Sequence, residues 1–115
     1  MEIHNTRPDQ LDLAFSALAD PTRRAILTRL AAGEATVSQL REPFALSQPT
    51  ISKHLKVLEE AGFIARGRDA QRRPRALVAL AFKDVADWIE PFRQQWEGRF
   101  QNLDAYLATM NKEEK

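Results

Sequence analysis

The chain has 115 residues, of which 43% are hydrophobic and 29% are charged, and these proportions predict one soluble domain with a single core. It contains no cysteine, which excludes disulfides and thiolate metal sites, and no apolar run approaches the roughly 20 residues that span a bilayer. Because the N-terminus also lacks the pattern of a signal peptide, we expect a cytoplasmic protein.

The net charge of +1 conceals an uneven distribution of charge along the chain. Residues 1–40 contain four basic and five acidic groups, residues 41–80 contain eight and four, and residues 81–115 contain five and seven. The middle third is therefore the only basic part. Such an asymmetry indicates that a polyanion binds to this third.

A first helix is predicted to begin at Pro8. Leu11, Ala14, Phe15 and Leu18 follow at the i, i+3, i+4, i+7 spacing that places apolar side chains on one helix face. We interpret this helix as part of the core.

A second helix is predicted to begin at Asp20-Pro21, since aspartate is a good N-cap and proline suits the first helical position. Its apolar residues continue as far as Gly33. These residues also favour a core helix.

Residues 36–62 follow the order of a helix-turn-helix: a short helix, a tight turn and a longer helix. Thr36 and Gln39 have the spacing of a capping box, and Pro43 limits the short helix to about two turns. The longer helix is predicted at about 47–61, with Ser47 as its N-cap and Gly62 closing its end in the left-handed conformation.

This longer helix has two chemically different faces. Apolar residues gather on one of them by their spacing, namely Ile51, Leu55, Leu58 and Ala61. The other faces carry amide, hydroxyl and ammonium groups, from Gln48, Thr50, Ser52, Lys53 and Lys56. Amides and hydroxyls can reach base edges in the major groove, and lysines neutralise phosphates. The pattern predicts a recognition helix that binds double-stranded DNA.

After Gly62, two strand-like pieces flank a basic tip, and we predict a β-hairpin over about 63–82 whose second strand spans 76–82. The segment 66–75 contains a single acidic residue, Asp69, and five arginines: Arg66, Arg68, Arg72, Arg73 and Arg75. Next to a helix-turn-helix, such a hairpin is typical of the wing of a winged helix, with its arginines on the DNA backbone or in the minor groove.

The last predicted helix spans about 84–110, and Pro91 is expected to kink or restart it. Its apolar stripe is too long and too aromatic for a core already covered by three helices and a hairpin. We therefore expect a homodimer whose seam is formed by the first and last helices. The expected seam residues are Leu11, Phe15, Trp88, Phe92, Trp96, Phe100, Leu103 and Leu107. The same stripe could instead line a ligand pocket, and a pocket between two subunits would satisfy both interpretations.

Three segments together resemble the ArsR family of bacterial transcriptional repressors. They are Ala17-Leu-Ala-Asp-Pro-Thr-Arg-Arg-Ala-Ile-Leu27, Thr36-Val-Ser-Gln-Leu40, and the Ser52-Lys-His-Leu55 centre of the longer helix. The resemblance implies a mainly α fold of about five helices with a small β-hairpin, in one winged-helix domain over 1–115. It also implies a homodimer that binds an inverted-repeat operator and represses transcription. By this resemblance, His54 joins Gln48, Thr50, Ser52 and Lys53 at or near the major groove.

Several alternatives remain at this point. His54 could contact phosphate, or it could pack and hydrogen-bond within the domain. The sequence lacks the cysteine and histidine ligands of metal-sensing family members, which leaves an all-carboxylate site of Asp84, Asp87 and Glu90 as the weaker alternative. The winged helix could also bind an acidic protein, although its polar recognition helix lacks apolar anchors. No motif for catalysis or for a cofactor is found, and no inducer can be identified.

Overall fold

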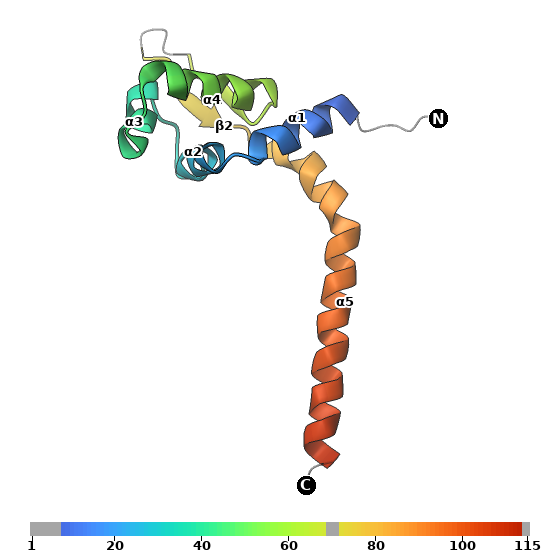
Figure 1. The fold of residues 1–115 in the computed structure, drawn as a ribbon. Coiled ribbons are helices and arrows are strands. Elements are labelled where there is room, and N and C mark those ends of the chain that lie inside the picture. Colours follow the sequence, from blue (N-terminus) through green and yellow to red (C-terminus); the bar gives the residue numbers. More distant parts are fainter. Residues whose placement is uncertain (1–7, 69–71, 114–115) are drawn as a thin grey trace. The chain divides into compact units, whose positions relative to one another are not determined.

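The computed structural model describes residues 8–68 and 72–113. In these residues the chain forms five α-helices, two short 3-10 helices and one antiparallel pair of strands, which confirms a mainly α fold with a small hairpin (Figure 1). The elements are α1 (Pro8–Leu18), α2 (Pro21–Ala31), α3 (Val37–Arg41), η1 (Glu42–Phe44), α4 (Gln48–Glu60), β1 (Ile64–Arg66), β2 (Arg75–Leu77), η2 (Ala79–Phe82) and α5 (Lys83–Glu113).

The chain divides into two compact units. The first extends through Val85 and contains every element from α1 to η2, and the second begins at Ala86 and contains most of α5. The predicted helix-turn-helix and hairpin therefore lie together in the first unit.

The helix starts have the capping residues that the sequence predicts. The Asp20 carboxylate accepts a hydrogen bond from the Arg23 backbone N–H at 3.0 Å at the start of α2. At α3, the Thr36 hydroxyl accepts from the Gln39 N–H, and the Gln39 side chain accepts from the Thr36 N–H, at 3.2 and 2.9 Å. These local bonds satisfy backbone donors that the helices themselves cannot.

The core of the first unit forms where α1, α2, α3 and β1 pack against α4. Its largest fully buried side chains come from α2, α3, α4 and the residue before β1: Ile26, Leu40, Ile51, Leu55, Leu58 and Phe63. The three α4 residues in this set are those whose spacing predicts a buried face. Helix α4 is thus joined to the core through one apolar face.

The hairpin is shorter than predicted. Strands β1 and β2 pair over three residues each, with Ile64 opposite Leu77 and Arg66 opposite Arg75. The prediction of a second strand through residue 82 is wrong, because residues 79–82 form the 3-10 helix η2. This turn places the ring of Phe82 4.4 Å from that of the buried Phe63, a contact that a continued strand would not make.

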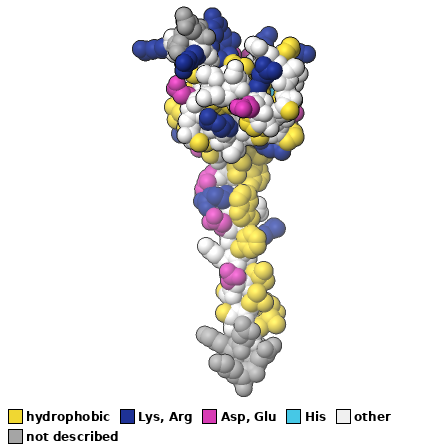
Figure 2. Space-filling view, turned by 90° about the vertical axis from the view of Figure 1, so that its left-hand side faces the viewer, with side chains coloured by type: hydrophobic (Ala, Val, Ile, Leu, Met, Phe, Trp, Pro, Cys, Tyr) yellow, Lys and Arg dark blue, Asp and Glu magenta, His cyan; other side chains and the backbone are white. Residues whose placement is uncertain are grey.

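Helix α5 runs from Lys83 to Glu113 as one helix that contains Pro91. Of the two expected effects of Pro91, a kink or a restart, the restart is therefore wrong: a proline removes one backbone hydrogen bond, and the helix continues through it. Val85, near the start of α5, is buried, but the large apolar side chains from Trp88 to Met110 are mostly exposed and form a stripe on one side of the helix (Figure 2). Even so, no helix in the described part of the chain is long and apolar enough to cross a membrane.

The N-cap of α2 gives a testable pH dependence. The hydrogen bond from the Arg23 N–H holds the pKa of Asp20 below its ordinary value of 3.8, with smaller contributions from the His54 and Arg23 charges. Because the folded-state pKa is lowered, ionised Asp20 stabilises the fold above the unfolded pKa. This contribution is lost as the pH falls through the folded pKa.

The replacement Asp20→Asn keeps a capping side chain but removes the titrating group. We expect the free energy of unfolding, measured by urea denaturation between about pH 5 and about pH 3, to fall more steeply for the wild type than for the variant. If the free energy of unfolding fell equally with pH in both proteins, the stabilisation by the cap would not depend on the charge of Asp20.

Candidate nucleic-acid interface

Helix α4 presents its polar side chains to solvent. Gln48, Thr50, Ser52, Lys53 and Lys56 are all exposed, whereas Ile51, Leu55 and Leu58 are buried. The predicted two-faced character of the helix is therefore confirmed. The exposed face contains amide, hydroxyl and ammonium groups, the groups that proteins use toward base edges and phosphates.

The hydroxyl of Thr50 is oriented by the helix cap. The Ser47 hydroxyl oxygen accepts a hydrogen bond from the Thr50 N–H at 3.3 Å, and the Ser47 O–H donates to the Thr50 hydroxyl oxygen at 2.9 Å. Since that oxygen already accepts one hydrogen bond, the Thr50 O–H remains a donor for an acceptor outside the helix. Thr50 can therefore donate to a base edge or to a phosphate oxygen.

His54 lies at the edge of the buried face, and its side chain is only 18% exposed. Its Nδ1 atom lies 3.4 Å from Nη1 of Arg23 and 4.0 Å from the Asp20 carboxylate. The same arginine also donates to the backbone oxygens of Ser16 and Ala17, at 3.0 and 2.8 Å. Of the two alternatives for His54, this geometry favours packing within the domain over contact with phosphate.

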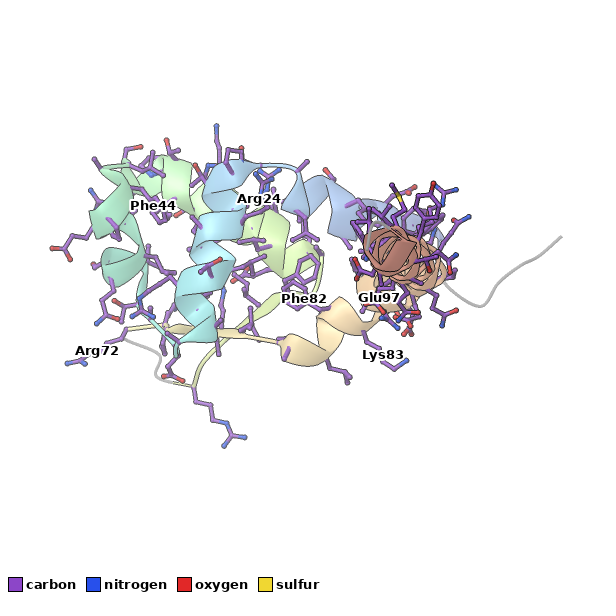
Figure 3. The ribbon with its side chains drawn as sticks, turned by 90° about the horizontal axis from the view of Figure 1, so that it is seen from below. Arg24, Phe44, Arg72, Phe82, Lys83 and Glu97 are labelled. Atoms are coloured by element: carbon purple, nitrogen blue, oxygen red, sulfur yellow. The ribbon has the colours of Figure 1, made fainter. Side chains whose placement is uncertain are left out.

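Four of the five arginines predicted on the wing are exposed: Arg66, Arg68, Arg72 and Arg73. In Figure 2, dark-blue lysine and arginine side chains are seen at the top of the view, where the wing lies. The Arg72 side chain points outward beyond the ribbon in Figure 3. Asp69, the acidic residue of the segment, lies outside the described residues. The exposed arginines give the wing a cationic surface that suits a polyanion.

The fifth arginine, Arg75, is a correction to the predicted site. Its side chain is 8% exposed, and Nε donates to the Glu59 carboxylate at 2.8 Å. It also donates to the backbone oxygen of Arg73. Its position in β2 directs the side chain inward, onto the last turn of α4, so a buried and ion-paired guanidinium cannot reach a DNA phosphate. The arginine count of the segment could not distinguish this residue from its exposed neighbours.

An open groove lies between the two helices of the helix-turn-helix and the wing. Its lining is mostly polar and comes from the start of α3, the first residue of α4 and the wing: Thr36, Val37, Ser38, Gln39, Gln48, Arg72 and Arg73. The groove thus brings two sets of predicted DNA contacts together with Ser38 and Gln39, which the sequence interpretation did not include. The sequence marked this place only as a helix start, through the capping box that Gln39 forms with Thr36.

Glu59 is a third residue that the sequence interpretation missed. It lies four residues after the buried Leu55 and is the first carboxylate in α4, so it falls beside the apolar face of the helix. A carboxylate at such a position indicates a cationic partner inside the domain. The structure shows two such partners, Arg66 and Arg75.

The carboxylates at the start of α5 do not form a cluster that could hold a metal ion. Across residues 8–68 and 72–113, no three His, Cys, Asp or Glu side chains gather in that way. Glu90 instead pairs with Arg93 at 2.6 Å, and this hydrogen bond lowers the pKa of Glu90. The all-carboxylate alternative therefore lacks the geometry it requires.

Comparisons with known proteins agree with this architecture. A family model described as a helix-turn-helix domain matches residues 18–66. The transcriptional repressor SdpR of Bacillus subtilis is 37% identical over 78 residues, covering 68% of this chain and 87% of that protein. The HTH-type transcriptional regulator Rv2034 of Mycobacterium tuberculosis is 43% identical over 74 residues, covering 60% of this chain and 69% of that protein.

Solved structures extend the agreement to the fold. The crystal structure of an ArsR family transcriptional regulator superposes with a TM-score of 0.69 at 42% identity, covering 76% of this chain and 97% of that one. An ArsR-like transcriptional regulator from Rhodococcus superposes with a TM-score of 0.66 at 25% identity, covering 83% and 90%. Together with the identity to SdpR across most of its length, these matches show that the chain belongs to the ArsR family of winged helix-turn-helix, DNA-binding transcriptional regulators.

Proposed function

We propose that this protein is a homodimeric transcriptional repressor that binds an inverted-repeat operator. One observation carries the proposal: the polar face of α4 and the exposed wing arginines are held on the same unit, and the groove between them is lined by both. The relative SdpR is named a transcriptional repressor, which supports the same direction of regulation.

In this proposal α4 enters the major groove. Gln48, Thr50 and Ser52, near its start, are within reach of base edges, and Lys53 and Lys56 neutralise phosphates on either side. The partial positive charge at the helix N-terminus adds to this attraction. Specificity then comes from the amide and hydroxyl groups, and much of the affinity comes from the cations.

The wing supplies contacts to the DNA backbone or to the minor groove. Arg66, Arg68, Arg72 and Arg73 provide the cations, and Arg75 is omitted for the reason given above. Arginine suits this role because its planar guanidinium can form two hydrogen bonds to one phosphate. The wing therefore strengthens binding with little dependence on base sequence.

The second copy is proposed from the surface of α5. Its apolar side chains are about half exposed over several turns, and they include Trp88, Phe92, Trp96, Phe100, Leu103 and Leu107. Contiguous apolar surface of this kind marks a protein contact site. With Leu11 and Phe15 of α1, this stripe forms the proposed seam, and the two recognition helices then contact half-sites about 34 Å apart.

The proposed function is tested by titrating the DNA upstream of the gene that encodes this protein with the protein itself. The titration is done at two salt concentrations, with and without a chelator. We expect tight binding that falls steeply with salt and is unchanged by the chelator. Equal affinity for random DNA would contradict the proposal that this upstream DNA contains the operator. An acidic protein partner would then become the favoured proposal.

The wing assignment is tested by Arg72→Ala. Loss of one phosphate contact in each subunit should lower the slope of log K against log salt by about 2, with a similar loss of affinity for all sequences. Arg99→Ala on α5 removes the same charge outside the first unit and should leave the slope unchanged. A loss confined to one operator sequence would contradict a backbone role for the wing.

The seam is tested by Trp96→Ala. Truncating a buried interface tryptophan costs on the order of 2 kcal/mol per subunit, or roughly a 1000-fold weaker dimer for two copies. Sedimentation across a dilution series measures the change, and Gln95→Ala, one position away, serves as the control. A variant that dissociates at the same concentration as the wild type would remove Trp96 from the seam.

A further inference from the structure

Glu59 joins the recognition helix to both strands of the wing. Its Oε2 atom accepts hydrogen bonds from Nε of Arg66 at 3.1 Å and from Nε of Arg75 at 2.8 Å. Arg66 belongs to β1 and Arg75 to β2, and the two residues are directly opposite each other in the hairpin. One carboxylate on the last turn of α4 therefore contacts both strands of the wing, at the strand pair next to its tip.

The burial of these groups makes the contact hard to replace. Arg75 is 8% exposed and Glu59 is 22% exposed, whereas Arg66 is 51% exposed. The backbone of Arg75 is also held by Ala35, through hydrogen bonds of 3.0 and 2.7 Å in both directions. A guanidinium so enclosed requires its carboxylate, because a buried charge without a partner is strongly destabilising. The ion pair therefore acts together with the hydrogen bonds to Ala35 to hold β2 against α4.

We propose that Glu59 is a positioning residue for DNA binding, which holds the wing and the recognition helix as one rigid unit on the operator. This inference rests on the proposed function, since it requires that α4 and the wing both contact DNA. The spacing between the major-groove contact and the wing contact is then set by the ion pair and not by the DNA. Glu59 itself need not touch the nucleic acid.

The sign of the charge makes this role distinguishable from simple electrostatics. A carboxylate near DNA repels phosphates, so its removal should by itself strengthen binding. A positioning role predicts the opposite, because a displaced wing loses phosphate contacts although every arginine is still present. Glu60, the next residue, is exposed and carries the same charge as Glu59. Both residues line a second groove, which also includes Ser52, Leu55, Lys56, Arg66 and Arg75 and is separate from the groove described above.

The experiment compares Glu59→Gln with Glu60→Gln in the full chain, on the operator, at several salt concentrations. For Glu59→Gln we expect weaker binding and a salt slope lower by about 2 or more, as wing contacts are lost in both subunits. For Glu60→Gln we expect the wild-type slope and equal or tighter binding. Hydroxyl-radical footprints should lose the wing protections in Glu59→Gln and keep those of the recognition helix.

Glu59→Asp provides a second test in case Glu59→Gln does not fold. It keeps the charge and shortens the side chain by one methylene, so the carboxylate reaches the two arginines less well. We expect a reduced slope relative to the wild type. A wild-type slope and footprint in Glu59→Asp, or Glu59→Gln behaving as Glu60→Gln, would overturn the inference while leaving the repressor proposal intact. A wild-type chain that does not prefer its operator would overturn both.

Discussion

The buried apolar face of α4 is the constraint on which the rest of this structure depends. Ile51, Leu55 and Leu58 fix the rotation of the helix about its own axis, since all three must point into the core formed with α1, α2 and β1. Once that rotation is set, Gln48, Thr50 and Ser52 have to face solvent. The direction in which the polar face of α4 points is therefore a consequence of packing in the core.

The sequence was most informative where local chemistry decides the structure. Asp20, Thr36 and Ser47 mark helix starts because their side chains cap nearby N–H groups, and all three do so in the structure. The two faces of α4 were also predictable, since they follow from the helical period alone. Such features depend on residues within a few positions of one another.

The sequence-based predictions were wrong where contacts between residues far apart in the chain determine the structure. The second wing strand ends early, where a 3-10 helix brings Phe82 onto Phe63, and residues 76–82 alone do not predict a contact with a residue so far along the chain. Arg75 is similar to the other wing arginines in sequence, and only its pairing with Glu59, 16 residues earlier, separates it from them. Pro91 was expected to kink or restart the last helix, and the helix does not restart there, because one lost backbone hydrogen bond need not end a helix of 31 residues. Charge and propensity are local properties, whereas burial is not.

The division of α4 into two faces also bears on how proteins of this kind diversify. Thr50 and Ser52 contribute nothing to the core, so substitutions there should have little effect on folding stability, and under the proposed function they would change which DNA sequence is preferred. Leu55, one turn further and fully enclosed, has no such freedom. The exposed face of α4 can therefore change in sequence while the fold is retained. If that face contacts the operator as proposed, the same separation makes it a practical place to engineer altered specificity.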